Sequence, residues 1–266
     1  MDRYYCDMID ASGDIELPDD QVHHALHVKR LRDGEEIEIF DGHGRVATAR
    51  VKTGKNCVGC DILGEIRLSA PPPFSLHIAT AIPKADRSEH LLESASQLGV
   101  HTVTWIDCRY SVVKVDGSGA KATKWRRIAI ESAKQCRRNW LMNVEGPIPL
   151  DRYLPGCGSP VLFADPSGGL HLNDWMIART PCAGVTLFIG PEGGFSPEEI
   201  QVLLAHGAQG VSLGVHILRV ETAVSAAAAI FGRWLMPLTH TQFHDGISGI
   251  KVANLGTTSK LASMSS

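Results

Sequence analysis

The stretch 185–200 reads Val-Thr-Leu-Phe-Ile-Gly-Pro-Glu-Gly-Gly-Phe-Ser-Pro-Glu-Glu-Ile: an apolar run, a glycine-rich turn, then a helix start. The apolar run Val185–Ile189 is typical of a buried strand. Ser196, Pro197 and Glu199 supply a cap, a first-turn proline and a capping-box glutamate. Because ligands of open α/β sheets bind just past the carboxyl ends of strands, this turn is a candidate ligand site. A tight turn without a ligand is the alternative.

The composition of the turn restricts the ligand. A phosphate-binding P-loop needs a Gly-Lys-Ser/Thr sequence, and the dinucleotide fingerprint needs G-x-G-x-x-G; the turn matches neither. Glu192 would repel a pyrophosphate but suits a ligand that carries ribose hydroxyls and a positive charge. S-adenosylmethionine has both properties.

A second strand–loop–helix segment follows at 210–223, Gly-Val-Ser-Leu-Gly-Val-His-Ile-Leu-Arg-Val-Glu-Thr-Ala. The expected helix Glu221–Leu235 is rich in alanine, so one face could pack closely on a ligand, on the sheet or on a second subunit. High helix propensity alone is the simpler explanation. Arg219 and Glu221 place two charges at the junction of loop and helix, which marks them as candidate functional residues.

The triplet Pro71–Pro73 divides the chain, because it can continue neither a helix nor a ladder of strands. Before it, Glu36–Phe40 and Arg45–Val51 alternate in polarity around a glycine-containing turn, which predicts a hairpin in a mostly β region with a short helix near Asp20–Arg30. After it, strands and helices alternate, which predicts an α/β domain with a mostly parallel sheet. The expected strands are 76–82, 100–106, 161–164, 185–189 and 210–213, and the expected helices include 86–98, 123–137 and 221–235. From about His240 the polar sequence predicts a disordered tail.

Composition excludes several classes of protein. The 266 residues contain no apolar run of membrane-spanning length and no secretory signal, so we expect a cytoplasmic protein. Seven irregularly spaced cysteines argue against a disulfide framework, and Cys57-x-x-Cys60 lacks the second pair of a zinc site. His23, His24 and His27 have metal-like spacing but no further donor, so capping or RNA contact is favoured and no metal is expected.

A basic segment stands out in a chain whose net charge is -3. Between Lys121 and Trp140 there are seven cations and one acid, and on a helix five of these charged residues share one face. Such a stripe is a candidate phosphate-binding surface, although a solvated helix face would have the same pattern. The stripe consists of Lys124, Arg127, Glu131, Lys134 and Arg138.

Together these segments resemble the bacterial 16S ribosomal RNA (uracil-N3)-methyltransferase family of the SPOUT superfamily of knotted methyltransferases. The resemblance rests on Gly-Pro-Glu-Gly-Gly-Phe together with Ile-Leu-Arg-x-Glu-Thr-Ala, in this order and spacing, and extends from His23 to Trp234. Other matching segments are His23-His24 to Gly34, Phe40-Asp41-Gly42, Lys84 to Arg87, Gln97 to Val100 and Trp125 to Gln135.

The resemblance implies a fold and a reaction. It implies a PUA-like β-barrel domain for RNA docking (1–70), a SPOUT α/β trefoil-knot domain (74–238) and a tail (239–266). It also implies a homodimer that uses S-adenosylmethionine to methylate N3 of a uridine in 16S rRNA of the small ribosomal subunit. The cofactor-binding residues carried over are Ile189, Gly190, Glu192, Gly193, Leu213, Gly214, Ile217 and Leu218.

We expect Arg219 to stabilise the developing uracil anion and Glu221 to hold it or to help remove the imide proton. Two other functions stay open: a 2′-O-ribose methyltransferase acting on other rRNA or tRNA, and a non-catalytic RNA-binding assembly factor. A dinucleotide-dependent oxidoreductase fits poorly, because the fingerprint is missing. The residues expected to contact RNA phosphates are Arg30, Arg32, Lys84, Arg87, Arg127 and Arg138.

The chain departs from the family pattern at two places. The family usually has arginine at His216 and often proline at Val215, so packing of the cofactor loop or an RNA contact could change. It usually has Ser-Gly-Arg at 136–138, where this chain reads Cys-Arg-Arg, so the local backbone could differ.

Overall fold

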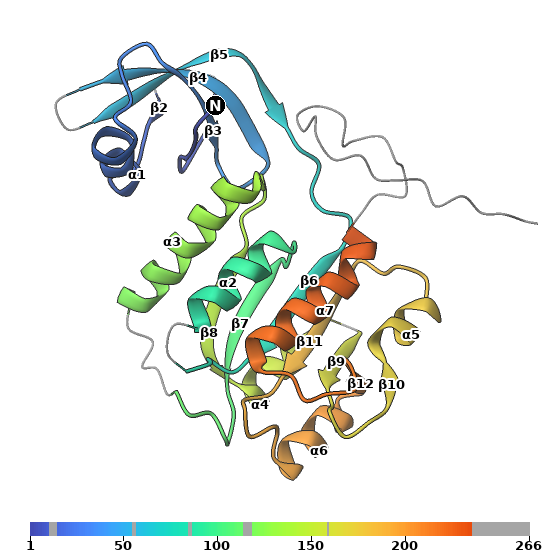
Figure 1. Ribbon diagram of the computed structural model, residues 1–266. Coiled ribbons are helices and arrows are strands. Elements are labelled where there is room, and N and C mark those ends of the chain that lie inside the picture. Colours follow the sequence, from blue (N-terminus) through green and yellow to red (C-terminus); the bar gives the residue numbers. More distant parts are fainter. Residues whose placement is uncertain (11–14, 55–56, 85–86, 114–118, 159, 236–266) are drawn as a thin grey trace, which may run out of the picture. The chain divides into compact units, whose positions relative to one another are not determined.

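The computed structural model describes residues 1–10, 15–54, 57–84, 87–113, 119–158 and 160–235 (Figure 1). Its amino-terminal part is a curled sheet of five strands in the order β1-β3-β4-β5-β2. No pairing joins β1 to β2 in the described residues, so the sheet is curled into a half-barrel, in keeping with the expected PUA-like fold. Its elements are β1 (Arg3–Tyr5), β2 (Ile15–Glu16), α1 (Asp19–His23), the π-helix η1 (His24–Lys29), β3 (Glu36–Phe40), β4 (Arg45–Thr53) and β5 (Val58–Leu68).

The predicted hairpin is confirmed. Strands β3 and β4 pair antiparallel, with Phe40 opposite Val46. The Asp41 carboxylate closes the turn, because it accepts from the amides of His43 (2.7 Å) and Arg45 (3.1 Å). Gly42 has a φ of +74°, which an L side chain rarely adopts. The alternation of the two strands buries Ile37, Ile39, Ala47 and Ala49 in the core of this sheet.

The second sheet has seven strands, all parallel, in the order β10-β12-β9-β11-β6-β7-β8. All five predicted strands of this region are present. The strands are β6 (Ser75–Thr80), β7 (Thr102–Asp107), β8 (Asn143–Pro149), β9 (Val161–Ala164), β10 (Leu170–His171), β11 (Gly184–Ile189) and β12 (Gln209–Ser212). The helices are α2 (Arg87–Gln97), α3 (Gly119–Cys136), α4 (Leu150–Tyr153), η2 (Leu154–Gly156), α5 (Leu172–Ile177), α6 (Pro197–Ala205) and α7 (Val220–Leu235).

Helices cover both faces of this sheet, and its central strands are mostly apolar because both faces are buried. Successive residues of β6 and β11 alternate between two cores: Ile78 and Leu187 belong to the core under α2 and α7, whereas Ala79 and Phe188 belong to the core under α4 and α6. Helices α2, α3 and α7 lie side by side in Figure 1, and α2 contacts both of the others.

Several elements differ from the prediction. Strand β8 lies at the edge of the sheet and contains Gly146 and Pro147. Because glycine and proline are unfavourable inside strands, the sequence does not predict a strand there. The short helices α4 and α5 and the two-residue strand β10 carry no periodic signal. Helix α3 ends at Cys136, so Arg138 lies outside it. The predicted cap Asp86 and the predicted tail from His240 lie outside the described residues.

Helix α3 is buried on two sides, which a single basic stripe does not predict. Trp125 and Ala129 pack into the core of the second sheet, as expected. Ile130 and Ala133, on another side, pack against Tyr5, Phe40 and Val46 of the amino-terminal sheet. The described chain up to Leu235 is therefore one compact unit.

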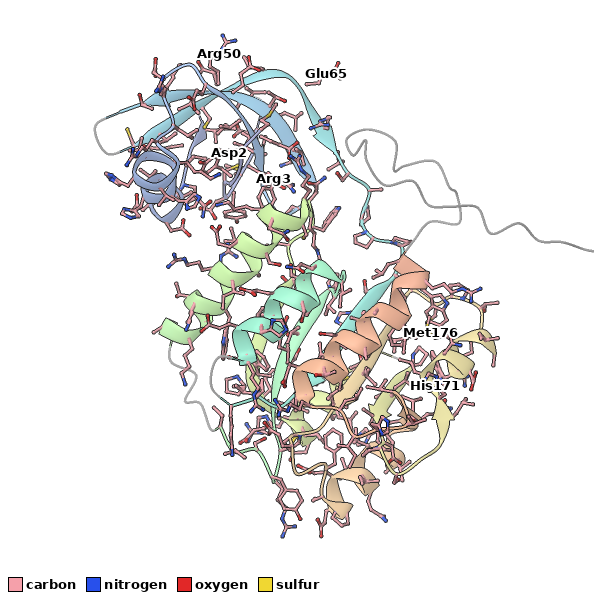
Figure 2. All side chains as sticks on the ribbon, viewed as in Figure 1. Asp2, Arg3, Arg50, Glu65, His171 and Met176 are labelled. Atoms are coloured by element: carbon pink, nitrogen blue, oxygen red, sulfur yellow. The ribbon has the colours of Figure 1, made fainter. Side chains whose placement is uncertain are left out.

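Two cations, Arg3 and Lys134, connect helix α3 to the amino-terminal part of the chain. The Arg3 side chain is 4% exposed, stacks on the Phe40 ring and donates to the carbonyl of Ala133 near the end of α3 (Figure 2). Lys134 is 9% exposed and donates to Gln21 (2.9 Å) and Glu131 (2.9 Å). Two of the five residues of the predicted stripe, Glu131 and Lys134, thus contact Gln21 of the amino-terminal part.

Candidate active site

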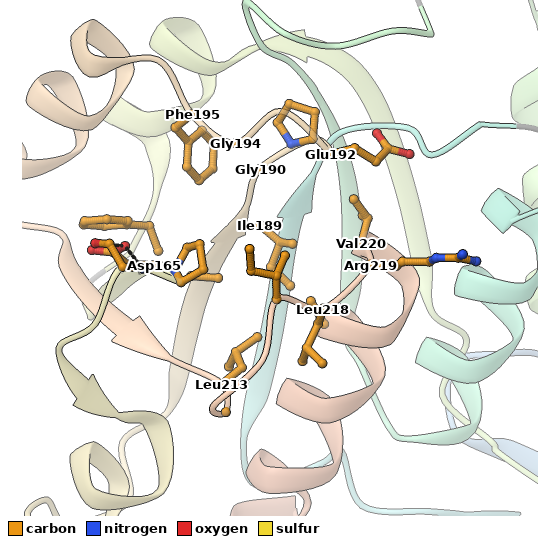
Figure 3. Close-up of a pocket in the computed structure, with 18 of the residues that line it drawn as sticks. Asp165, Ile189, Gly190, Glu192, Gly194, Phe195, Leu213, Leu218, Arg219 and Val220 are labelled. Carbon is orange, nitrogen blue, oxygen red and sulfur yellow. Dashed lines mark hydrogen bonds between the residues drawn. The ribbon is translucent and has the colours of Figure 1, made fainter.

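A cavity of about 430 Å³ opens at the carboxyl ends of β9, β11 and β12, which are adjacent in the sheet (Figure 3). Its volume lies within the range typical of small-molecule sites. Three loops form it, residues 163–167, 189–195 and 213–219, and the first turns of α7 close one side. The two segments that decided the sequence interpretation therefore meet at one site.

The turn after β11 is held rigidly by α6. The Ser196 hydroxyl accepts from the Glu199 amide (3.2 Å), and the Glu199 carboxylate accepts from the Ser196 amide (2.7 Å), so the predicted capping box is confirmed. Glu199 also accepts from the amide of Arg109, which follows β7 (2.7 Å). The segment after β7 is thereby hydrogen-bonded to α6 beside the turn that follows β11.

Gly190 is the point of closest packing in this turn. A Cβ added there would lie 3.2 Å from the backbone of Gly194 and of Phe195, so a side chain would force the turn to shift. The absence of a side chain lets the turn fold back on itself beside the cavity.

Seven of the eight predicted cofactor residues line the cavity: Ile189, Gly190, Glu192, Leu213, Gly214, Ile217 and Leu218. Gly193 is the exception, since a Cβ there would meet the Tyr110 side chain at 3.1 Å. Gly193 thus makes room for the segment after β7.

The predicted catalytic residues lie at the start of α7. Arg219 lines the cavity, and Figure 3 shows its side chain and that of Glu192 extending to the same side, away from the apolar wall. Glu221 does not line the cavity; its side chain is 13% exposed, and its Oε1 lies 4.0 Å from Nε of Arg87.

The predicted RNA-contacting cations separate into two kinds. Arg30, Arg32, Lys84 and Arg127 are exposed and make no side-chain ion pair among the described residues. Arg138 donates to the carbonyls of Ser96 (3.0 Å) and Trp140, and burial lowers its pKa to about 10. Arg138 therefore joins the chain after α3 to α2, and its contacts leave little of the guanidinium for a phosphate.

Residues that sequence reasoning missed come from the end of β9 and from the loop after it. Phe163, Asp165 and Ser167 line the cavity, and the Asp165 carboxylate accepts from the Ser167 amide (2.8 Å) and hydroxyl (2.6 Å). The sequence Asp-Pro-Ser-Gly-Gly directly after an apolar strand is a turn signal that could have indicated this loop.

Three acidic, histidine or cysteine side chains do not converge anywhere in the described residues in a way that could hold a metal ion. In the same part of the chain, no helix has the length and apolarity that crossing a bilayer requires.

The comparisons with known proteins agree with this site. Residues 70–232 match the RNA methyltransferase domain family, and residues 17–58 match the RNA methyltransferase PUA domain family. Ribosomal RNA small subunit methyltransferase E of Mycobacterium bovis is 30% identical over 87% of this chain and 92% of its own, and that of Bacillus subtilis is 27% identical over 84% and 93%.

Solved structures extend the likeness to the fold. A methyltransferase of Legionella pneumophila with bound S-adenosylmethionine has a TM-score of 0.80 at 30% identity, covering 87% of this chain and 96% of its own. Ribosomal RNA small subunit methyltransferase E of Neisseria gonorrhoeae, also bound to S-adenosylmethionine, has a TM-score of 0.79 at 29% identity, covering 88% and 97%.

Fold and site therefore define an S-adenosylmethionine-dependent RNA methyltransferase, in which an α/β domain with a parallel sheet is preceded by a PUA-like half-barrel. More narrowly, the chain belongs to the ribosomal RNA small subunit methyltransferase E family.

Proposed function

We propose that this protein methylates N3 of a uridine in the 16S rRNA of the small ribosomal subunit, in the cytoplasm, with S-adenosylmethionine as the methyl donor. The observation that carries the proposal is the cavity in which the Gly190–Gly194 turn and the Leu213–Arg219 loop meet. Relatives that act on small-subunit rRNA support the choice of substrate.

The residues of the cavity fit S-adenosylmethionine. Ile189, Leu213 and Leu218 offer an apolar wall to an adenine ring, and the backbone at Gly190 can approach a ligand closely. Glu192 and Asp165 offer acceptors for ribose hydroxyls and a negative potential for a cationic ligand. When bound, the cofactor supplies an electrophilic methyl group.

Attack by N3 requires that the uracil lose its imide proton. We assign proton acceptance to Glu221, whose Oε2 is buried and has no hydrogen-bond partner among the described residues. We assign stabilisation of the resulting uracil anion to Arg219, which lines the cavity and makes no ion pair in that part of the chain. Alignment of base and methyl group supplies much of the remaining rate.

Residues 1–70 are proposed to dock RNA and residues 74–238 to carry out catalysis, with 239–266 as a tail outside the described residues. The exposed cations at 30, 32, 84 and 127, which have no side-chain ion pair within the described part of the chain, are the proposed phosphate contacts. Arg138 is left out, because its guanidinium is bound to two carbonyls.

A homodimer is part of the proposal. Val215 and Ile217 are 94% and 85% exposed on the loop that forms the cavity. Exposed apolar side chains beside a site are typical of an interaction surface, and a second copy would cover them. Light scattering is expected to give twice the chain mass for the wild type. The double variant Val215→Asp, Ile217→Asp is expected to have the mass of one chain. A monomeric wild type would contradict the proposed homodimer.

The test of function is methyl transfer from labelled S-adenosylmethionine to purified small ribosomal subunits, followed by nucleoside analysis of the RNA. N3-methyluridine is the expected product, and Arg219→Ala is expected to lose most turnover at saturating substrate. A 2′-O-methylated nucleoside would move the assignment to the ribose-methylating alternative. Absence of cofactor binding would support the assembly-factor alternative.

A further inference from the structure

The guanidinium of Arg87 lies between two carboxylates at the edge of the cavity. Its Nη1 is 3.8 Å from Oε1 of Glu192, and its Nε is 4.0 Å from Oε1 of Glu221. The three residues come from three separate segments: the first turn of α2, the turn after β11 and the first turn of α7. Arg87 thus links the cofactor turn to the helix that carries the proposed proton acceptor.

The two oxygens of Glu221 have different surroundings. Oε1 faces Arg87, whereas Oε2 is buried and has no hydrogen-bond partner among the described residues. A buried carboxylate oxygen without a partner is unfavourable unless a ligand supplies the missing donor. The imide N3–H is the one donor on the pairing edge of uracil, so it can fill this role.

We propose that Arg87 is a positioning residue for methyl transfer: it fixes the Glu221 carboxylate so that Oε2 meets the imide proton, and it holds Glu192 at the cofactor turn. The inference rests on the proposed function. Because Glu192 and Glu221 are both negative and both face Arg87, the cation offsets a repulsion that would otherwise push the two segments apart.

This role replaces the phosphate contact that the sequence suggested for Arg87. Two carboxylates beside a guanidinium oppose the approach of a third anion. The four cations proposed to bind RNA have no such neighbours in the described chain. Arg87 therefore differs from them in its surroundings, although all five are basic.

The experiment compares steady-state methylation of small subunits by wild type, Arg87→Gln, Arg87→Lys and Arg233→Gln. Arg87→Gln is expected to lower kcat by about 100-fold, the size expected for a misplaced reacting group, while the KM for RNA stays within about threefold. Arg87→Lys keeps the charge and is expected to recover part of kcat. Arg233, exposed at the end of α7, is the control and is expected to behave as wild type. A raised KM with unchanged kcat would overturn the proposal in favour of a phosphate contact.

A double variant separates positioning from a merely structural effect. If Arg87 acts through Glu221, then Arg87→Gln combined with Glu221→Gln is expected to be no slower than Glu221→Gln alone. If the fold decreases in kcat of the two single variants multiply in the double variant, the proposal is overturned. Thermal melting of each variant checks folding, and Arg87→Lys keeps the proposal testable if Arg87→Gln unfolds. Failure of the proposed function would look different: the wild type itself would yield no N3-methyluridine.

Discussion

The guanidinium of Arg137 lies 3.7 Å from the carboxylate of Glu38, although the Arg137 backbone is left-handed, with a φ of +58°. The amide of the next residue, Arg138, donates to the carbonyl of Ala133, which is the usual way a helix closes on a glycine. The family pattern has glycine at this position, so the arginine keeps the backbone of the glycine. It adds an ion pair between the end of α3 and the amino-terminal sheet.

Replacing Arg137 tests whether the strained left-handed backbone or the ion pair with Glu38 has the larger effect on stability. Arg137→Gly is expected to raise the free energy of unfolding by about 1 kcal/mol, because a left-handed side-chain residue is strained. The Arg137 side chain is 64% exposed, and Glu38 keeps its ion pairs with Arg3 and Arg67. Loss of the Arg137–Glu38 ion pair therefore costs less stability than relief of the backbone strain adds. Arg137→Ala keeps the strain without the pair and is expected to be the least stable of the three. Urea denaturation measures the order, and a less stable glycine variant would show that the ion pair dominates.

Gly190→Ala is expected to weaken S-adenosylmethionine binding at least tenfold, or about 1.4 kcal/mol, while the protein stays folded. The added methyl group would lie 3.2 Å from the backbone of Gly194 and Phe195, so the turn must shift. Gly156→Ala is the matched control, since nothing lies within 4 Å of a Cβ there. Calorimetric titration measures both affinities, and equal affinities would mean that the turn accommodates the methyl group.

Neutralising Arg32 and Arg127 together is expected to weaken RNA binding and to reduce the slope of log affinity against log salt by about 1.5. Both side chains are exposed and lack an ion pair among the described residues. Arg152→Gln changes an exposed cation of α4 that has no assigned role and should leave the slope unchanged. Binding measured at several salt concentrations decides the point, and an unaltered slope in the double variant would remove these residues from the RNA surface.

Acid should destabilise the fold through His77 on β6 and His101 directly before β7, whose rings lie 5.1 Å apart. Burial lowers the pKa of both, and each also faces a second positive group, His101 for His77 and Arg138 for His101. The unfolded chain therefore takes up these protons first, so stability is complete above the unfolded value of about 6.5 and falls as the pH drops below it.

The double variant His77→Asn, His101→Asn is expected to flatten the dependence of Tm on pH between about 5 and 7. His90→Asn, an exposed change on α2, should keep the wild-type dependence. Thermal melts in matched buffers measure the slopes, and equal slopes for the double variant and wild type would assign acid sensitivity to other groups.

Local sequence predicted the elements whose own residues decide their conformation. The hairpin of Glu36–Phe40 and Arg45–Val51, the capping box at Ser196 and the central strands β6 and β11 followed from alternation, turn chemistry and helix-end chemistry over a few residues. Strand β8 did not, because pairing with β7 outweighs the weak strand signal of a segment that contains Gly146 and Pro147.

The sequence by itself also determined the class of protein and two of the three loops that form the cavity, because the two glycine-rich segments carry their own backbone requirements. Only the tertiary structure decided which cations bind which partners. Arg87, Lys134 and Arg138 look alike in sequence, but the chain brings Arg87 to Glu192 and Glu221, Lys134 to Gln21, and Arg138 to two carbonyls. Charge in a sequence gives the sign of an interaction, whereas its partner depends on segments that only folding brings together.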